Sequence, residues 1–176
     1  MLVVRWLEPD VAEDVALASA VADVVNRAYA HAETGLFLTK IDRTDAADVA
    51  ASISRRETAV ALLDGIVVGS IRAATIDERT SWFGALGVDP AFLGHGLGAA
   101  LVRFVEDDAA GSGKAEMQLE VLDSKPIHPH LSQVRAWYER RGYIETSRRP
   151  IAAVHPEDAA SLAVDSMDVV TMRRPL

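Results

Sequence analysis

Alternating and helically spaced apolar residues divide the chain into short strands and amphipathic helices. Short apolar runs, rich in β-branched residues, predict strands over residues 2–6, 58–63, 66–71, 81–88, 117–122, 143–146 and 167–173. Apolar residues spaced three and four positions apart predict helices within residues 21–28, 45–53, 97–105 and 131–138. Residues 31–42 and 124–130 lack a period and are interpreted as largely loop, and residues 155–166 as a long loop or a short helix.

A two-residue turn, Asp64-Gly65, separates the second and third predicted strands. An Asp-Gly pair between two apolar runs favours a hairpin, because both turn positions need a positive φ. The order of elements is then β–α–α–β–β–β–α–β–α–β–β, with hairpins first and a helix crossover later. This order predicts an α/β fold with a mixed, mostly antiparallel central sheet flanked by helices on both faces.

The length of 176 residues predicts one domain over residues 1–176, because about 150 residues is a usual domain size. Hydrophobic residues make up 49% of the chain and charged residues 25%, which is typical of globular proteins. No apolar run approaches the ~20 residues of a membrane span, and the N-terminus lacks the pattern of a secretory signal. We therefore expect a cytoplasmic protein that makes no membrane contact.

Charge and cysteine content exclude several kinds of partner and chemistry. With 18 Lys and Arg against 26 Asp and Glu, the net charge of −8 disfavours nucleic acids and mildly favours cationic partners such as amines. The chain has no cysteine, which excludes disulfides, thiolate nucleophiles and cysteine-ligated zinc. His31, His128 and His130 have no carboxylate partner at a fixed spacing, so we expect no metal site.

The most specific segment is a glycine-rich turn, Leu93-Gly94-His95-Gly96-Leu97-Gly98, which leads directly into a predicted helix. Glycine lacks a Cβ, so its backbone N–H group can approach an anion closely. The N-terminus of the helix adds about half a positive charge. A strand, a glycine turn and a helix together can therefore cradle a pyrophosphate. The alternative is a tight turn whose glycines only permit close packing.

Two other phosphate-binding motifs compete for this turn. A P-loop requires Gly-Lys-Ser/Thr at its end, whereas Gly98 is followed by two alanines. A dinucleotide-binding fingerprint matches loosely as Gly94-x-Gly96-x-x-Ala99, with Glu120 near the expected acidic position. The antiparallel strands predicted before the turn argue against this fingerprint. A dinucleotide-binding enzyme is therefore kept only as an alternative.

The turn resembles the acetyl-coenzyme A (acetyl-CoA) loop of the GNAT superfamily of N-acetyltransferases. That family has Gln/Arg-x-x-Gly-x-Gly/Ala after a strand that ends in Val-x-Pro. Here Val88-x-Pro90 precedes the turn, and Gly96 and Gly98 match the two small residues. Leu93 occupies the Gln/Arg position, which removes one side-chain contact and leaves the backbone cradle intact. His95 stands where the family usually has Arg or Lys, and either faces a phosphate or is an exposed loop residue.

A second segment extends the resemblance downstream. Residues 136–143 read Ala-Trp-Tyr-Glu-Arg-Arg-Gly-Tyr and are similar to the family's aromatic-Tyr-Glu-Lys-x-Gly-Phe segment. Leu131 stands where the family often has an Asn that contacts the pantetheine arm, and the adjacent Ser132 is a candidate substitute. Together the two motifs cover residues 82–146 in the family's order of elements.

The resemblance implies transfer of an acetyl group from acetyl-CoA, the co-substrate, to a primary amine of a small molecule, protein or peptide. It also implies a GNAT-type sheet that splays beside Val88 and holds the cofactor in the gap. The implied cofactor-binding residues are Leu86, Gly87, Val88, Leu93, Gly94, His95, Gly96, Leu97, Gly98 and Ala99. Without a cysteine there can be no thiol-linked acyl-enzyme, so we expect direct transfer in a ternary complex.

Candidate catalytic residues come from the resemblance and from the strand pattern. Tyr138 matches the family tyrosine that can protonate the leaving thiolate; the alternative is that it only packs on the sheet. Glu120 is the candidate base, because it lies mid-strand among apolar residues, where an uncompensated charge is costly. The alternative is a Glu120 that is exposed or paired with an arginine. Glu33, in the early loop that shapes the family's acceptor site, is a weaker candidate.

Two further hypotheses concern partners and activity. A homodimer is expected to form, if at all, through the C-terminal strands. A non-catalytic acyl-CoA-binding module is the alternative function, because it would keep the glycine cradle but acetylate no amine.

Overall fold

The computed structural model describes residues 1–176, the whole chain. Its elements are β1 (Leu2–Trp6), η1 (Pro9–Val11), α1 (Val15–Ala32), α2 (Ala46–Ser54), β2 (Thr58–Leu63), β3 (Ile66–Thr75), β4 (Thr80–Val88), η2 (Pro90–Phe92), α3 (Leu97–Gly111), β5 (Glu116–Lys125), α4 (Pro129–Glu139), β6 (Ile144–Pro150), α5 (Ile151–Val154), α6 (Pro156–Ala159) and β7 (Ser166–Pro175). Acidic side chains begin the first two helices. Asp14 accepts a hydrogen bond from the N–H of Leu17 at 3.0 Å, and Asp45 accepts one from the N–H of Asp48 at 2.8 Å. Each satisfies a donor that has no partner inside its helix.

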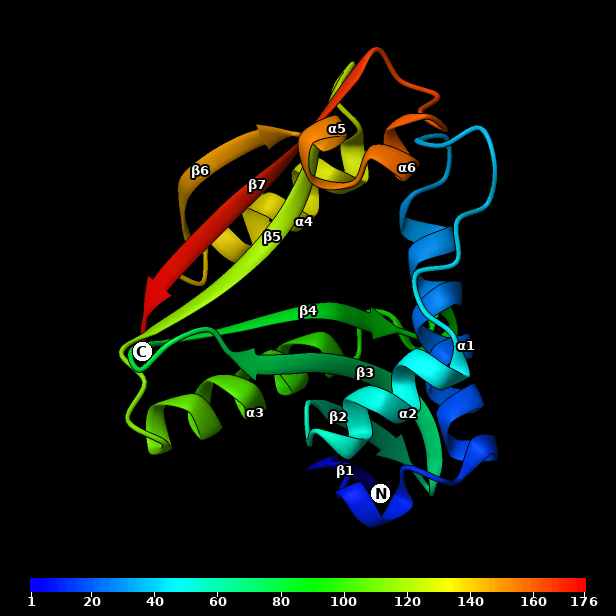
Figure 1. Cartoon of the computed structure of the whole chain (residues 1–176), viewed down its shortest axis with the longest axis vertical. Coiled ribbons are helices and arrows are strands. Elements are labelled where there is room, and N and C mark those ends of the chain that lie inside the picture. Colours follow the sequence, from blue (N-terminus) through cyan, green and yellow to red (C-terminus); the bar gives the residue numbers. More distant parts are fainter.

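Seven strands form one sheet in the order β1-β2-β3-β4-β5-β7-β6. All neighbouring pairs are antiparallel except β4 and β5, which are parallel. The helices α1 and α2 cover one face of the sheet, and α3 and α4 cover the other (Figure 1). The predicted α/β fold, with a mixed and mostly antiparallel sheet flanked by helices, is therefore confirmed.

Buried side chains form a hydrophobic layer on each face of the sheet. The layer under α3 and α4 contains Phe83 and Leu101, and the layer under α1 and α2 contains Val21 and Ile53. A third buried cluster lies where the α1–α2 loop meets α5 and β7. Its members are Leu36, Leu131, Ile151, Met167 and Val169. This third cluster joins the α1–α2 loop to α4, α5 and β7.

Most predicted elements are confirmed, and the differences lie at their ends. The turn residues Asp64 and Gly65 have φ values of 49° and 87°, as the predicted hairpin requires. The loop predicted at 124–130 is shorter than expected, because β5 continues to Lys125 and α4 begins at Pro129. The sixth strand continues to Pro150, and α5 and α6 follow it. Helix α6 lies within residues 155–166, where a short helix was one of the two expectations. Helix α5 was not predicted, because four residues contain too little periodicity to be recognised from apolar spacing.

β4 and β5 pair only near their first residues and then separate. Residues 80–82 pair with residues 116–118, and beyond them the two strands diverge (Figure 1). Residues 84–88 of β4, called the free edge of β4 below, therefore have no strand partner on the β5 side. A bulge against β3 lies in the same stretch, where Ala85 has a φ of 47°. The predicted splaying of the sheet beside Val88 is confirmed.

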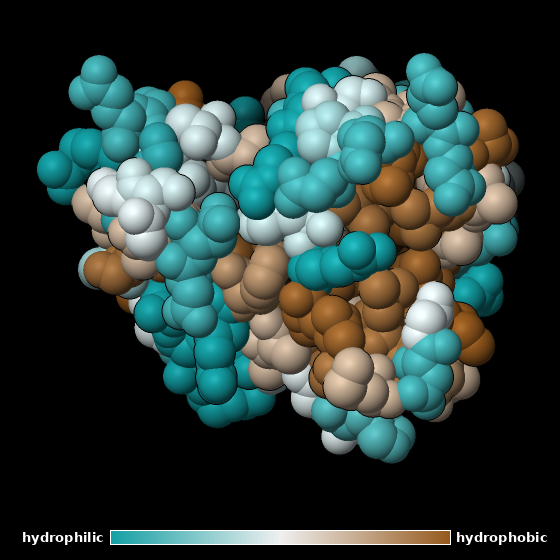
Figure 2. All heavy atoms as spheres, turned by 90° about the horizontal axis from the view of Figure 1, so that it is seen from below, coloured by the Kyte–Doolittle hydropathy of each residue, from teal (hydrophilic) through white to brown (hydrophobic).

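The two outer strands of the sheet present different surfaces. All seven residues of β6 are exposed, and a bulge between Glu145 and Ser147 interrupts its pairing with β7. Bulges and charged residues on an edge strand oppose pairing with another chain, so β6 gives the expected dimer little support. At the other edge, Leu2 and Val3 of β1 are exposed. Figure 2, which views the end of the molecule where β1 lies in Figure 1, shows an area of hydrophobic surface. No helix has both the length and the apolar character needed to cross a membrane.

Gly87 permits the close contact between α1 and β4. A Cβ at this position would lie 3.0 Å from the Cα of Val25 and 3.2 Å from the Cβ of Ala28. We expect Gly87→Ala to lower the free energy of unfolding by about 1–3 kcal/mol, because the backbone of α1 would have to shift. Gly111→Ala is the control, since a Cβ there meets nothing within 4 Å and a helical alanine is favoured. Equal denaturation midpoints for the two variants would contradict this account of the packing.

Candidate active site

The glycine turn begins at a fixed point after β4. Asp89 accepts a hydrogen bond from the N–H of Ala91 at 3.0 Å and another from the Arg27 guanidinium at 2.7 Å. These bonds, first the one from Ala91 and then the one from Arg27, hold the pKa of Asp89 below its usual value. Asp89 is therefore a turn residue that ties the end of β4 to α1.

The turn presents an unbroken series of free N–H groups at the start of α3. The backbone N–H groups from Gly94 to Ala99 donate to no group of the protein, and the ladder resumes when the N–H of Ala100 donates to the carbonyl of Gly96. Gly94 and Gly96 have φ values of 81° and 76°, which L-residues with side chains seldom adopt. A Cβ on either glycine would meet nothing within 4 Å, so the space in front of the turn is open. Free donors, open space and a helix N-terminus together fit an anionic pyrophosphate.

The side chains of the glycine turn offer fewer contacts to an anion than its backbone does. The carbonyls of Phe92 and Leu93 lie 3.2 and 3.0 Å from Nδ1 of His95. A carbonyl can only accept, so Nδ1 carries a proton and Nε2 of a neutral ring has none to donate to a phosphate. Leu93 is exposed, and the side chain of Leu97 is buried in the core. With a neutral His95, the turn therefore offers an anion only its backbone.

The free edge of β4 leads directly to this turn. Leu86 and Val88 are half-buried and pack against the core layer under α3 and α4. A Cβ on Gly87 would face α1 instead, so only its backbone can reach a ligand on the other side. A Cβ on Gly98 would lie 3.8 Å from a methyl group of Val88, an ordinary contact. The structure thus brings the ten predicted cofactor residues together along one strand edge and one helix start.

Tyr138 lies beneath the point where β4 leaves β5. It is buried, and its ring centroid is 6.0 Å from that of Phe83, the first β4 residue beyond the paired segment. Burial raises its pKa above the usual value, and the nearby Tyr29 raises it further, whereas Arg141 acts in the opposite direction. No protein group forms a hydrogen bond with the Tyr138 hydroxyl, and its oxygen is not sealed from solvent. The hydroxyl is therefore protonated and available to a ligand.

Glu120 is not the buried charge that the strand pattern suggested. The alternation of β5 buries Met117 and Leu119 and leaves Glu120 exposed on the opposite face. An oxygen of Glu120 lies 3.1 Å from the guanidinium of Arg149 on β6. The expectation of an uncompensated charge is therefore wrong, and the alternative is confirmed, since Glu120 is both exposed and paired with an arginine. A strand residue flanked by inward-facing neighbours faces outward. Glu120 does lie just past the last residue of β5 that pairs with β4.

A half-buried ion-pair cluster joins the α1–α2 loop to α6. Arg43 contacts the carboxylate of Glu33 at 2.6 Å and that of Asp158 at 2.8 Å. The side chain of Asn26 accepts a hydrogen bond from the N–H of Arg43 at 2.8 Å. We call Asn26, Glu33, Arg43 and Asp158 the Arg43 clamp. Glu33 is thus an ion-pair partner, and burial raises its pKa although Arg43 acts against that shift.

No pattern in the sequence indicates the clamp, because Arg43 and Asp158 are 115 positions apart. Sequence reasoning also missed Tyr29, whose ring centroid lies 5.7 Å from the Arg43 guanidinium carbon. A usable signal for Tyr29 was its spacing. It follows the buried Val25 by four residues, so a polar aromatic side chain falls on the apolar stripe of α1.

The three histidines considered as metal ligands lie near one another but have other partners. The carbonyl of Thr34 accepts a hydrogen bond from Nε2 of His128 at 3.0 Å. Burial lowers the pKa of His130, and nearby His128 and His31 lower it further. No three His, Cys, Asp or Glu side chains are arranged to hold a metal ion.

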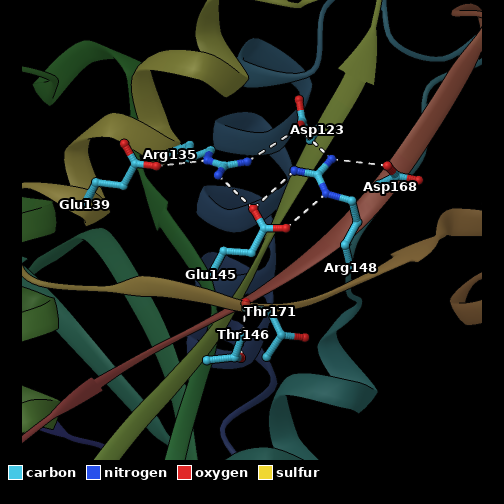
Figure 3. Close-up of polar contacts among 8 residues, drawn as sticks. All are labelled: Asp123, Arg135, Glu139, Glu145, Thr146, Arg148, Asp168 and Thr171. Atoms are coloured by element: carbon cyan, nitrogen blue, oxygen red, sulfur yellow. Dashed lines mark hydrogen bonds and ion pairs between the residues drawn. The ribbon is translucent and has the colours of Figure 1, made fainter.

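Arginines near the C-terminal strands divide into paired and unpaired groups. Arg135 of α4 and Arg148 of β6 share the carboxylates of Asp123 and Glu145, and Arg148 also contacts Asp168 at 3.1 Å (Figure 3). These partners raise the pKa of Arg148, with Glu145 the largest contributor. The paired network fixes α4 against β5, β6 and β7. By contrast, the guanidinium carbon of Arg141 lies 3.5 Å from the ring centroid of Trp137 and forms no ion pair.

The sequence of the chain matches the model of a known protein family. The profile of the Acetyltransferase (GNAT) family matches residues 25–143 of the chain. This range includes the glycine turn, the free edge of β4 and Tyr138. No curated protein matches the chain in sequence.

Solved structures agree with the chain in fold at low sequence identity. PaiA N-acetyltransferase from Thermoplasma acidophilum, in complex with coenzyme A, superimposes with a TM-score of 0.73 at 14% identity, over 100% of this chain and 99% of its own. The ribosomal-protein-S18-alanine N-acetyltransferase of Escherichia coli gives 0.69 at 20% identity, over 99% and 94%. A polyamine N-acetyltransferase of Drosophila melanogaster gives 0.68 at 16% identity, over 100% of both chains.

Proposed function

The chain belongs to the acetyltransferase (GNAT) family, and from that premise we propose that it transfers an acetyl group from acetyl-CoA to a primary amine by direct transfer in a ternary complex. The observation that carries the proposal is the series of free N–H groups from Gly94 to Ala99, next to the free edge of β4. Donors in a row at a helix N-terminus suit the pyrophosphate of coenzyme A. The unpaired edge of β4 supplies further backbone groups for the amides of the pantetheine arm.

Bound acetyl-CoA supplies a thioester whose carbonyl carbon accepts the amine while the coenzyme leaves as a thiolate. Tyr138 is proposed to donate its proton to that leaving sulfur, since its hydroxyl is protonated and has no protein partner. Backbone N–H groups along the free edge of β4 are proposed to orient the acetyl group and to stabilise developing negative charge on its oxygen. The chain has no cysteine, which supports direct transfer over a thiol-linked intermediate.

Glu120 is proposed to take the amine proton through water, from its exposed position just beyond the paired part of β5. We expect Glu120→Gln to lower kcat/KM for the amine about tenfold at neutral pH, because a carboxamide cannot accept a proton. Glu116→Gln is a matched control. Both carboxylates lie on β5 beside an arginine, with side chains 38% exposed for Glu116 and 39% for Glu120. An equal effect of the two substitutions on kcat/KM would leave Glu120 without a role as base.

The acceptor is proposed to be a small-molecule amine or the amine of a protein or peptide. Two of the structures of similar fold are named for such acceptors, an alanine of a ribosomal protein and a polyamine. The negative charge of the chain also favours cationic amines over nucleic acids. The cytoplasmic location, the homodimer and the single-domain boundary expected from the sequence stay predictions.

The proposal is tested by titration calorimetry with acetyl-CoA, with NAD as the comparison, followed by an amine screen. The screen contains polyamines, aminoglycosides and peptides with an N-terminal alanine, and it detects released coenzyme with a thiol reagent. The reagent sees only the coenzyme, because the protein has no cysteine. We expect saturable binding of acetyl-CoA alone and thiol release that depends on an amine. Binding without release from any amine would support the non-catalytic module, and binding of NAD alone would support the dinucleotide alternative.

A further inference from the structure

Helix α1 runs from the N-terminal part of the sheet to the place where β4 and β5 diverge, and Tyr29 lies near its C-terminal end. Its contact with β4 is fixed at Gly87, where Val25 and Ala28 leave no room for a Cβ. Tyr29 follows Val25 by four residues, so it lies on the same face of α1 and one turn farther along. In Figure 1, α1 continues past β4 toward α6 and the C-terminal strands. Tyr29 therefore lies beside the free edge of β4, on the face of the sheet opposite α3 and α4.

The ring of Tyr29 packs against the Arg43 clamp. Arg43 lies over its ring, 5.7 Å from guanidinium carbon to ring centroid, and also 5.2 Å from the ring of Phe37. The side chain of Asn26 fixes the backbone at Arg43 and at the next residue. It accepts a hydrogen bond from the N–H of Arg43, and its amide donates to the carbonyl of Thr44 at 2.9 Å. Both carboxylates of the Arg43 clamp are largely shielded, with side chains 9% and 13% exposed.

The clamp lies where the α1–α2 loop meets the segment between β6 and β7. The N–H of Leu38 donates to the carbonyl of Ser161 at 2.7 Å, and the N–H of Ala163 donates to the carbonyl of Leu36 at 2.9 Å. These bonds tie the α1–α2 loop to the segment between β6 and β7. Arg43 is shared by two carboxylates, so the clamp carries no net positive charge that would repel an ammonium group.

The three tyrosines of the chain differ in what their hydroxyls contact. Tyr143 donates to a carboxylate oxygen of Glu106 at 2.6 Å inside the core. The hydroxyls of Tyr29 and Tyr138 form no hydrogen bond with the protein, and neither oxygen is sealed from solvent. Burial and then Glu33 raise the pKa of Tyr29 to about 12, so the phenol is neutral at physiological pH. Tyr29 also raises the pKa of Tyr138, as expected for two tyrosines that both lie where β4 leaves β5, one following the α1 contact with Gly87 and the other packed against Phe83.

We propose that the Tyr29 hydroxyl, held by the Arg43 clamp, binds the acceptor amine on the side of the reacting centre opposite Tyr138. This inference rests on the proposed acetyl transfer. A neutral phenol accepts a hydrogen bond from an amine N–H through its oxygen and leaves the nitrogen lone pair free to attack. Tyr29 is then a binding residue for the acceptor, whereas Tyr138 acts on the leaving group. The two tyrosines should therefore affect different kinetic constants.

The test is a set of three tyrosine-to-phenylalanine variants, assayed with the screened amine that gives the wild type its highest kcat/KM. We expect Tyr29→Phe to raise KM for the amine about tenfold, with Kd for acetyl-CoA and the thermal midpoint unchanged, because only one ligand contact is lost. Tyr143→Phe is the matched control. It loses a buried hydrogen bond, so its thermal midpoint should fall while KM for the amine stays the same.

An unchanged KM for the amine in Tyr29→Phe, with an active wild type, would overturn this inference and leave acetyl transfer standing. A fall in the thermal midpoint as large as that of Tyr143→Phe would assign Tyr29 a structural role instead. A wild type that binds acetyl-CoA but acetylates none of the amines would overturn the proposed function and this inference with it. Arg43→Gln supplies a second test, because freeing the clamp should reproduce the rise in KM without any change in Kd for acetyl-CoA.

Discussion

Gly96→Asp is expected to raise Kd for acetyl-CoA by about a hundredfold or more, equivalent to about 2.8 kcal/mol, while the fold survives. The new carboxylate would stand among the free N–H groups from Gly94 to Ala99, where it would occupy donors and repel the pyrophosphate. Its Cβ would meet no atom within 4 Å, so the main structural cost is the φ of 76°. Titration calorimetry measures the affinity, and circular dichroism confirms the fold.

Gly113→Asp is the matched control for this loss of binding. Gly113 lies just past the opposite end of α3, has a φ of 80°, and would also accept a Cβ without contact within 4 Å. The two variants therefore share the added charge and the backbone strain but differ in distance from the turn. Wild-type affinity in Gly96→Asp, or an equal loss in Gly113→Asp, would show that the pyrophosphate binds elsewhere.

The glycine turn could be predicted because its structure is determined locally. Positive φ values at Gly94 and Gly96 and an immediate helix start depend on residues within the turn itself. The same reason explains the success at the Asp64-Gly65 hairpin. The proposed cofactor site also depends on local conformation, because its donors are backbone N–H groups. The departure from the family pattern at Leu93 therefore leaves the cradle in place.

The residues proposed to bind the acceptor amine could not be predicted, because they come from segments that are distant in the sequence. The Arg43 clamp needs α1, the α1–α2 loop and α6 to meet, and no spacing in the sequence records that meeting. Glu120 illustrates a different failure. Its apolar neighbours suggested burial, but in a strand those neighbours face the opposite side. The strand alternation that identified β5 was therefore also the evidence that Glu120 is exposed.

This division has a consequence for specificity within the fold. The proposed coenzyme site consists of backbone groups of β4 and α3, which many sequences can supply. The proposed acceptor site consists of side chains of α1, its loop and the segment between β6 and β7. Substitutions in the second group should therefore change which amine is used while leaving the affinity for acetyl-CoA unchanged.

Tyr138→Phe is expected to lower kcat by about a hundred- to a thousandfold and to leave Kd for acetyl-CoA unchanged. Phenylalanine keeps the ring contacts with Phe83 and Trp137, whose centroids lie 6.0 and 4.8 Å away, so the packing of α4 is retained. Only the proton donor to the leaving sulfur is removed. Steady-state kinetics with the best amine of the screen, together with calorimetry, separates the two constants. An unchanged kcat would mean that the thiolate leaves without help from Tyr138.

The pH dependence of the wild type provides an independent test of this role. A general acid works only below its own pKa, and burial raises the pKa of Tyr138 above the usual value near 10. Its hydroxyl should therefore stay protonated throughout the neutral and mildly alkaline range. As pH rises, kcat/KM for the amine should increase while the free amine loses its proton, and it should not decline below about pH 10. A decline beginning near pH 9 that Tyr138→Phe abolishes would show that the phenol ionises too early to act as described.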